Sequence, residues 1–266
     1  MSDYTELSGF DDEQFQSTEV KIYKNEVDNT DRIGFVPKET LAKDYLEKLK
    51  KFGKSDEEAK QIIAAKGKKG SLEKVERDGQ IYFRESTWLT ATTHYHAESK
   101  KRFVCLGPGE ICCKKIKDSP ITQFITLICK YMTKPNGDLI EPIQAEVKPW
   151  RMGESKYVDL KDKDKRSPLI KYDIEFKCTD TKFQKGSMNV IFNEGVALKR
   201  DPKVEKEVMD RAAALWPIIG KKFLGERLTE DEVREMLSGE TINNEAPKQE
   251  QTEVKGEDLG SVLDNF

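Results

Sequence analysis

The chain has 266 residues, of which 36% are hydrophobic and 36% are charged, and its net charge is −3. No stretch approaches the ~20 consecutive apolar residues that span a bilayer, and the acidic start MSDYTELSGFDDEQF lacks the apolar segment of a signal peptide. Five cysteines are an odd number and too few for a disulfide framework. These numbers exclude a membrane-spanning or disulfide-stapled chain, so we expect a cytoplasmic protein whose cysteines are thiols or metal ligands.

The charges are segregated along the chain. Residues 1–31 contain two lysines against nine acids, and residues 239–266 contain two against seven. Residues 80–200 carry 22 basic and 15 acidic residues. A basic middle between acidic ends is typical of a core that binds a polyanion and of acidic interaction tails, and a solvated surface with disordered ends is the alternative.

The first predicted elements follow an acidic N-terminal arm, residues 1–31. RIGFVP reads as a short strand that Pro37 ends, and a helical insertion over residues 39–66 follows. Its second helix begins with a capping box, Ser55 and Glu58, and leads into a glycine-rich basic loop, Lys66–Ser71. This basic helical hairpin either decorates the fold or contacts phosphates through that loop.

From residue 80 the pattern changes to an alternation of period two, rich in aromatic and β-branched residues. Turn signals separate the predicted strands, among them Asn136-Gly137 at a hairpin tip and Lys161–Asp164. Five or six strands with irregular connections predict a mainly β fold with added helices, in which residues 32–195 form a partly open barrel like the oligonucleotide-binding (OB) fold.

Helical periodicity returns over residues 196–238. Pro202 lies near a helix start, and Pro217 is expected to interrupt or end that helix. A last helix is predicted after Thr229, which forms a capping box with Glu232. Residues 239–266 have no periodicity and are predicted to be a disordered acidic tail.

Signatures of enzymes are scarce. The chain has no phosphate-binding glycine motif, no nucleophile elbow and only two histidines. Scattered acids of the Lys-rich segment around Asp162 could hold magnesium in a nuclease, but a solvated loop explains them better. We therefore predict a protein that is not an enzyme.

Aromatic residues beside cations favour nucleic-acid binding. Residues 80–200 hold 13 of the 23 aromatic residues, and many have a basic neighbour. Lys and Arg that track phosphates, together with rings that stack on unpaired bases, are how proteins hold single strands. Trp150 and Tyr131 are the favoured stacking residues, whereas Tyr172 and Phe176 are expected in the core. The predicted nucleic-acid-binding residues are Lys68, Lys69, Tyr82, Arg84, Trp88, Lys100, Lys101, Arg102, Lys114, Lys115, Tyr131, Trp150, Arg151, Lys182, Phe183 and Lys185.

The acidic tail ends on an apolar cluster, GEDLGSVLDNF, which a disordered polar tract has no folding reason to carry, and a fortuitous ending is the alternative. A terminal Phe that fills a pocket, with carboxylates that meet basic groups around it, is a known mode of peptide recognition. The predicted partner-binding residues are Asp258, Leu259, Leu263, Asp264 and Phe266. Such a tail could also fold back on the basic groove.

Over residues 32–192 the chain resembles the single-stranded DNA-binding (helix-destabilising) proteins of tailed bacteriophages, including podoviruses. The segments that carry the resemblance are RIGFVP, the His and Cys cluster of residues 93–113, ITLICKYMTKPNGDLIEPIQAEVKPW, LIKYDIEFKCTDTKF and the acidic end on Phe. The resemblance implies an OB fold, sequence-independent and cooperative binding of single-stranded DNA in the host cytoplasm, and roles in DNA replication, recombination and repair. It also implies that the tail recruits replication or recombination proteins or RNA polymerase.

The resemblance further implies a structural zinc held by one His and three Cys. The matching positions are His94 or His96, Cys105 and the pair Cys112-Cys113. Adjacent cysteines replace the usual C-x-x-C, and neighbouring residues of a strand point to opposite faces, so both could bind one ion only from a turn. Cys129 and Cys178 lie in strand contexts that predict buried thiols.

A second function is compatible with the same sequence. In this alternative, the protein is a transcription regulator or replication adaptor that binds a polymerase through its helices and tail, and the barrel is a scaffold.

Overall fold

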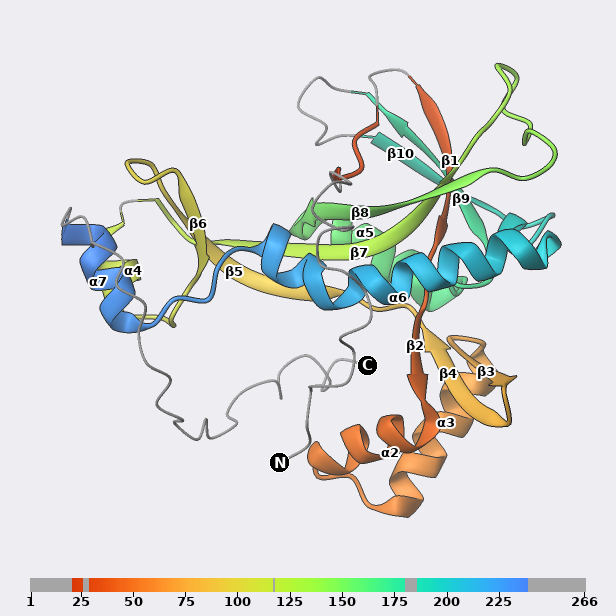
Figure 1. The fold of residues 1–266 in the computed structure, drawn as a ribbon, viewed down its shortest axis with the longest axis horizontal. Coiled ribbons are helices and arrows are strands. Elements are labelled where there is room, and N and C mark those ends of the chain that lie inside the picture. Colours follow the sequence, from red (N-terminus) through yellow and green to blue (C-terminus); the bar gives the residue numbers. More distant parts are fainter. Residues whose placement is uncertain (1–20, 26–28, 117, 180–185, 239–266) are drawn as a thin grey trace.

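The computed structural model describes residues 21–25, 29–116, 118–179 and 186–238, apart from the side chain of Lys221. It is a mixed α and β structure in which two antiparallel sheets are joined and covered by helices (Figure 1). The predictions for residues 1–20 and for the tail at 239–266 lie outside the described residues. Within the described ranges, no helix has both the length and the apolar character needed to cross a membrane.

The main sheet has seven strands, and its longest strand, β7, holds it together. The order is β10-β9-β1-β7-β5-β6, and β8 pairs along the other edge of β7. β1 and β5 share one edge of β7, because β5 pairs with its first half and β1 with its second. The strands are β1 (Thr30–Phe35), β5 (Leu89–His96), β6 (Lys101–Val104), β7 (Ile121–Tyr131), β8 (Ala145–Gly153), β9 (Asp173–Cys178) and β10 (Gly186–Ile191).

The predicted barrel does not close. Among the described strands, β8 and β10 do not pair, so the sheet is open there and no closed barrel of five or six strands is present. Pro149 of β8 has no N–H to donate to another strand at this edge. Its carbonyl instead accepts a hydrogen bond from the backbone N of Tyr23 at 2.8 Å, and Asn25 Nδ2 donates to the Phe176 carbonyl of β9 at 2.8 Å. Residues 21–25, which the predicted N-terminal arm includes, therefore belong to the core at the open side of the sheet.

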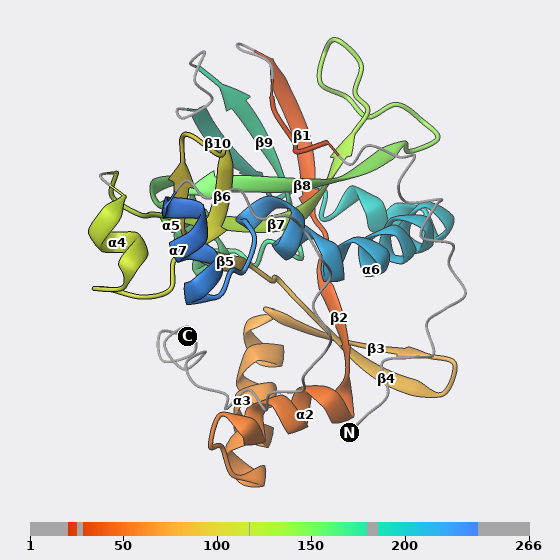
Figure 2. The same ribbon diagram turned by 60° about the vertical axis from the view of Figure 1, so that its left-hand side comes forward.

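Two helices cover opposite faces of β7 and β8 (Figures 1 and 2). α5 (Glu154–Arg166) packs its buried Leu160 into the cluster that contains Trp150. α6 (Pro202–Leu224) follows a short 3₁₀ helix, η1 (Ala197–Arg200), and packs against the other face. The predicted turn at Lys161–Asp164 is wrong, because these residues lie inside α5.

Pro217 does not end α6, contrary to expectation, since the helix continues to Leu224. Pro217 is exposed, whereas Leu215, Trp216 and Ile219 beside it are buried against the sheet. This burial on both sides of the proline compensates for the backbone hydrogen bond that a proline removes.

The insertion between β1 and β5 forms a separate lobe with its own small core. It contains β2 (Lys38–Leu41), α2 (Ala42–Lys51), α3 (Asp56–Lys69), β3 (Leu72–Arg77) and β4 (Gln80–Glu85), and its sheet has the order β2-β4-β3. The predicted helical hairpin and its capping box at Ser55 are confirmed. The predicted basic loop is wrong, because α3 continues to Lys69 and Gly70 (φ 76°) caps it.

Two small helices complete the described fold. α4 (Ile111–Lys115) and α7 (Glu230–Ser238) lie side by side beyond β6, as both views show (Figures 1 and 2). The predicted capping box of α7 is confirmed, since Thr229 N donates to Glu232 Oε2 at 2.6 Å and Glu232 N donates to Thr229 Oγ1 at 3.3 Å.

A buried carboxylate, Asp173, connects the sheet to the start of α6. Its Oδ2 accepts hydrogen bonds from Arg32 Nε (3.0 Å) and Nη2 (2.9 Å) and from the backbone N of Ala197 (3.0 Å). Its Oδ1 accepts from Tyr131 Oη at 3.1 Å, and that same hydroxyl accepts from Leu198 N at 3.2 Å. Burial raises the pKa of Asp173, and the hydrogen bonds and the Arg32 charge oppose that rise.

The Asp173→Ala substitution should lower the free energy of unfolding by about 3–5 kcal/mol, because it removes the buried acceptor of Tyr131 Oη and Ala197 N and leaves Arg32 paired only with the more exposed Glu194. Urea denaturation followed by circular dichroism measures this loss. Asp162→Ala on the exposed face of α5 is the control and should change stability by less than about 0.5 kcal/mol. A loss for Asp173→Ala no larger than that of the control would show that the network does not stabilise the fold.

Candidate functional site

Four predicted ligands converge where the β5–β6 hairpin meets α4. They are His94, Cys105, Cys112 and Cys113, and their ligand atoms all lie within 4.8 Å of one another. Cys105 Sγ is 3.4 Å from Cys113 Sγ and 3.9 Å from Cys112 Sγ, and Cys113 Sγ is 3.4 Å from His94 Nε2. A tetrahedral site with bonds of ~2.0–2.3 Å places its ligand atoms roughly 3.3–3.8 Å apart. This cluster could therefore hold a metal ion.

The adjacent cysteines satisfy the geometry because they lie in a helix rather than a strand. Cys112 and Cys113 belong to α4, where successive side chains are about 100° apart and can point toward the same ion. The objection that adjacent cysteines point to opposite faces therefore does not apply here. His94 comes from β5, and Cys105 directly follows β6, so the cluster joins a β-hairpin to α4.

The remaining histidine and the two remaining cysteines lie elsewhere. His96 is outside the cluster, and its Nδ1 is 2.9 Å from Ser99 Oγ. Cys129 and Cys178 are fully buried in the main core, as predicted. The candidate metal cluster thus contains one of the two histidines and three of the five cysteines.

The protonation of the cluster without metal follows from its burial. Burial raises the pKa of the Cys105 thiol to about 12, and the neighbouring cysteines add to the rise. Burial also lowers the pKa of His94, so its ring is neutral at pH 7 and available as a ligand. A metal must displace the thiol protons before it can bind.

The cluster lies in a module with a small hydrophobic core. Phe103, Cys112 and Val233 are fully buried there, and they bring together β6, α4 and α7. Two backbone hydrogen bonds, from Val104 N to the Glu226 carbonyl and from Glu226 N to the Arg102 carbonyl, also hold the segment between α6 and α7 along β6. A core of so few buried side chains contributes little to the stability of this module. A bound ion would supply much of the additional stability that the module needs.

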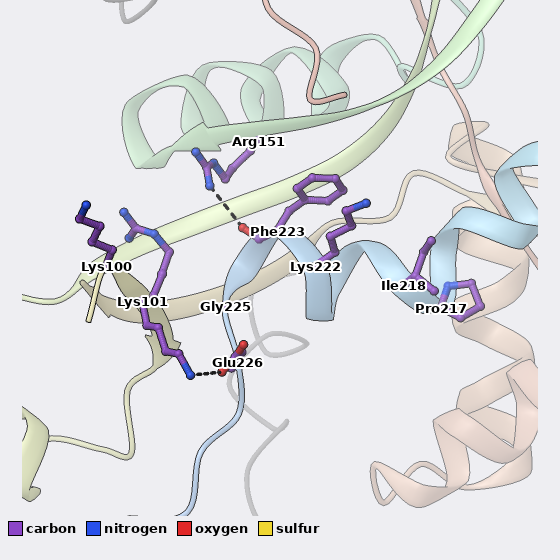
Figure 3. A pocket seen from close by; sticks show the side chains of 10 residues that line it. Lys100, Lys101, Arg151, Pro217, Ile218, Lys222, Phe223, Gly225 and Glu226 are labelled. Carbon is purple, nitrogen blue, oxygen red and sulfur yellow. Dashed lines mark hydrogen bonds and ion pairs between the residues drawn. The ribbon is translucent and has the colours of Figure 1, made fainter. Parts of the chain in front are cut away.

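A basic groove of about 590 Å³ lies beside this module (Figure 3). It is formed by the β5–β6 hairpin, by Arg151 of β8 and by the C-terminal part of α6. Figure 3 shows Arg151 hydrogen-bonded to the Phe223 carbonyl at 3.4 Å and Lys101 facing Glu226 at 4.0 Å. Its lining residues are Lys100, Lys101, Arg102, Arg151, Pro217, Ile218, Lys222, Phe223, Gly225 and Glu226.

The groove gathers five cations and a single carboxylate, Glu226. In the described part of the chain, no ion pair forms at Lys100, Arg102, Arg151 or Lys222. Burial lowers the pKa of Arg151, and repulsion from the neighbouring Arg102 charge adds to this effect. An anion in the groove would relieve this repulsion.

Aromatic rings accompany these cations. Phe223 lines the groove, whereas Tyr95 of β5, which is 44% exposed, is not among the lining residues. The Arg102 guanidinium lies 5.7 Å from the centre of the Tyr95 ring, while its Nη1 donates to Thr93 Oγ1 at 3.0 Å. The groove therefore combines five cations with one partly buried aromatic ring, Phe223.

Of the predicted nucleic-acid-binding residues, the groove brings together Lys100, Lys101, Arg102 and Arg151. Lys114 and Lys115 are exposed on α4 nearby, and Lys68 and Lys69 are exposed at the end of α3. Lys182, Phe183 and Lys185 lie outside the described residues, as do Asp258, Leu259, Leu263, Asp264 and Phe266 of the tail.

Two rings favoured for stacking are unavailable. Trp150 is 3% exposed and Tyr131 is 1% exposed, and both belong to hydrophobic clusters. Alternation along a strand explains this, because Arg151 points to the surface where Trp150 points inward. Phe176 is buried as predicted, whereas Tyr172 is only partly buried and was wrongly placed in the core.

Three further predicted contacts have structural partners. Arg84 pairs with Glu39 and with Glu205 of α6, at 2.7 Å each, so it clamps the lobe to the core. The Arg77 guanidinium lies over the ring of Tyr82 of β4, 5.1 Å from the ring centre. Trp88 is half-buried and packs against other aromatic rings.

Lys222, Phe223 and Tyr95 were missed as site residues. Lys222-Phe223 is a cation beside an aromatic ring, the same signal that selected other residues, but it lies in a segment expected to form only C-terminal helices. The contact of α6 with β8 places it in the groove.

No family model, curated protein or solved structure matches this chain. The function is therefore inferred from the residues of the groove and of the metal cluster.

Replacing Cys113 with Ser should reduce the metal content of the purified protein from about one ion per chain to near zero, because a ligand of a four-coordinate site is lost. Elemental analysis by mass spectrometry measures this content. Cys178→Ala removes a buried cysteine outside the cluster and should keep the metal. Equal metal contents in Cys113→Ser and in the unmodified protein would rule out the site.

Metal affinity should rise with pH between about pH 6 and pH 8, because the Cys105 thiol, whose pKa is about 12 without metal, must lose its proton on binding. His94 contributes little to this dependence, since its lowered pKa leaves it neutral over most of the range. Competition with a chromophoric chelator at several pH values measures the affinity. An affinity independent of pH would contradict binding through thiolates.

Proposed function

We propose that this protein binds single-stranded DNA without sequence preference, through the basic groove between the β5–β6 hairpin, β8 and α6. The observation that carries the proposal is the convergence of five cations and an aromatic ring on one groove with a single acid. Proteins that hold single strands combine a basic channel for the phosphates with rings for the bases. We do not propose an enzymatic activity.

The strand connections support this proposal. β1, β7, β8, β9 and β10 are arranged in space as β8-β7-β1-β9-β10, and α5 connects β8 to β9. We propose that they form a divergent OB fold that stays open between β8 and β10. In OB folds, the second and third strands and the loop after the first strand hold oligonucleotides. Arg151 comes from the third of these strands, and Lys100–Arg102 come from the long insertion after the first.

We propose zinc as the metal of the His94, Cys105, Cys112 and Cys113 cluster. Three thiolates and one imidazole in a tetrahedral arrangement suit Zn²⁺, and four protein ligands leave no open position for catalysis. A structural ion would hold the β5–β6 hairpin, and with it Lys100–Arg102, at the edge of the groove.

We also propose that the acidic tail recruits replication or recombination proteins or RNA polymerase, with Phe266 as its apolar anchor. The support is the sequence pattern of the tail, seven acids against two lysines with an apolar end.

Replacing Lys100, Lys101 and Arg151 with Ala together should weaken binding to poly(dT). For single strands, log K falls with log[salt] by about 0.7 for each phosphate contact, so loss of these contacts should reduce the slope by roughly 2. Fluorescence anisotropy at several salt concentrations measures affinity and slope. A triple variant with the same charge change on other faces, Lys43→Ala, Lys203→Ala and Lys206→Ala, is the control.

Two outcomes would refute the function. One is that the unmodified protein does not bind single strands at low salt, and the other is that it binds duplex DNA equally well. Repeating the titration with RNA shows whether binding is selective for DNA.

A further inference from the structure

Away from the groove, two aromatic rings form an exposed pair. Phe192 is 60% exposed, more than any other large hydrophobic side chain in the described part of the chain. Its ring centre lies 5.4 Å from that of Tyr172, at an interplanar angle of 62°. Tyr172 directly precedes β9 and Phe192 directly follows β10, so neighbouring strands hold the pair at one end of the sheet. The pair lies outside the hydrophobic clusters, so core packing does not account for it.

The basic end of α3 contacts Lys171, the neighbour of this pair in the sequence. The side chain of Lys171, the residue before Tyr172, occupies the space beside Gly70, where any added Cβ would meet it. Gly70 caps α3, and Lys68 and Lys69 are exposed in the last turn of that helix. A second contact supports this junction of the lobe with the main sheet, since Lys199 of η1 pairs with Glu73 of β3 at 2.7 Å.

The local charge is positive. Glu194, two residues after Phe192, is neutralised by Arg32 at 2.8 Å and by Arg200 at 2.9 Å. For Lys68, Lys69 and Lys171, no ion pair exists with any described residue. Exposed rings beside unpaired cations are suited to a polyanion that also carries flat apolar groups.

We propose that Tyr172, Phe192 and the basic turn of α3 form a second subsite for single-stranded nucleic acid. A base stacks on the exposed Phe192 ring, which Tyr172 supports edge-on, and Lys68, Lys69 and Lys171 bind the flanking phosphates. The subsite rests on the proposed function, because it extends the contact of the same strand from the core to the lobe. None of its residues lines the groove.

The subsite is tested with the full-length protein and an oligo(dT) series of increasing length. Phe192→Ala should weaken binding of oligonucleotides that reach both subsites by between about 5-fold and 150-fold, the range for one stacked base. Phe192→Trp should restore the affinity, because it keeps a ring for stacking. Met132→Ala, which truncates another exposed side chain (49% exposed), is the control and should leave the affinity unchanged.

Photocrosslinking gives a direct readout. Oligonucleotides with 5-iodo-deoxyuridine should crosslink to Tyr172 or Phe192 in the unmodified protein. In addition, Lys68→Ala/Lys69→Ala should reduce the salt slope by about 1.4, whereas Lys43→Ala/Lys51→Ala on the exposed face of α2 should not.

The outcomes separate this proposal from the function itself. If the unmodified protein binds single strands but Phe192→Ala binds equally well and no crosslink maps to the pair, the subsite is refuted and the groove remains. If Phe192→Ala changes the oligomeric state in light scattering but not the DNA affinity, the pair is a protein contact and the subsite is also refuted. If the unmodified protein binds no single strand, both proposals fail.

Discussion

Asp173 is a fully buried carboxylate on which groups from β1, β7 and η1 converge. A charge in this position is tolerated only if each partner is in place, because an unpaired buried carboxylate is very costly. Gly34 makes room for it, since a Cβ there would lie 2.6 Å from Tyr131 Oη. The carboxylate thereby fixes the start of α6, and the helix then crosses the sheet and brings Lys222 and Phe223 to the groove.

The two proposed subsites use different means of support. The groove depends on the module of β6, α4 and α7, whose hydrophobic core is small and whose four candidate ligands are in position to hold it together. The aromatic pair depends on the main sheet, because β9 and β10 hold Tyr172 and Phe192, and on the docking of the lobe. A metal ion bound to these ligands would therefore stabilise the groove more than the aromatic pair.

Local patterns predicted local features of this chain well. Two capping boxes placed the starts of α3 and α7, and the β-branched and aromatic residues after residue 80 indicated strands there, because these signals act between residues close in sequence. α5 was missed because its lysines and aspartates obscure the short apolar stripe around Leu160. The groove was only half predicted, since α6 reaches β8 through tertiary packing, which no local pattern encodes. The metal cluster was predicted as a set of residues, but its geometry depended on a helix at Cys112-Cys113 that the sequence did not indicate.

The segment at Tyr23 and Asn25 has a consequence for synthesis of the chain. Asn25 reaches the Phe176 carbonyl across 151 residues, and Arg32 reaches Asp173 across 141. During synthesis on a ribosome, residues 21–35 therefore cannot complete their core contacts until more than half of the polypeptide has emerged. Loop closure over such separations is slow, and the apolar face of β1 stays uncovered meanwhile. The lobe, whose own core and strand pairs lie within residues 38–85, can fold long before the sheet that carries it.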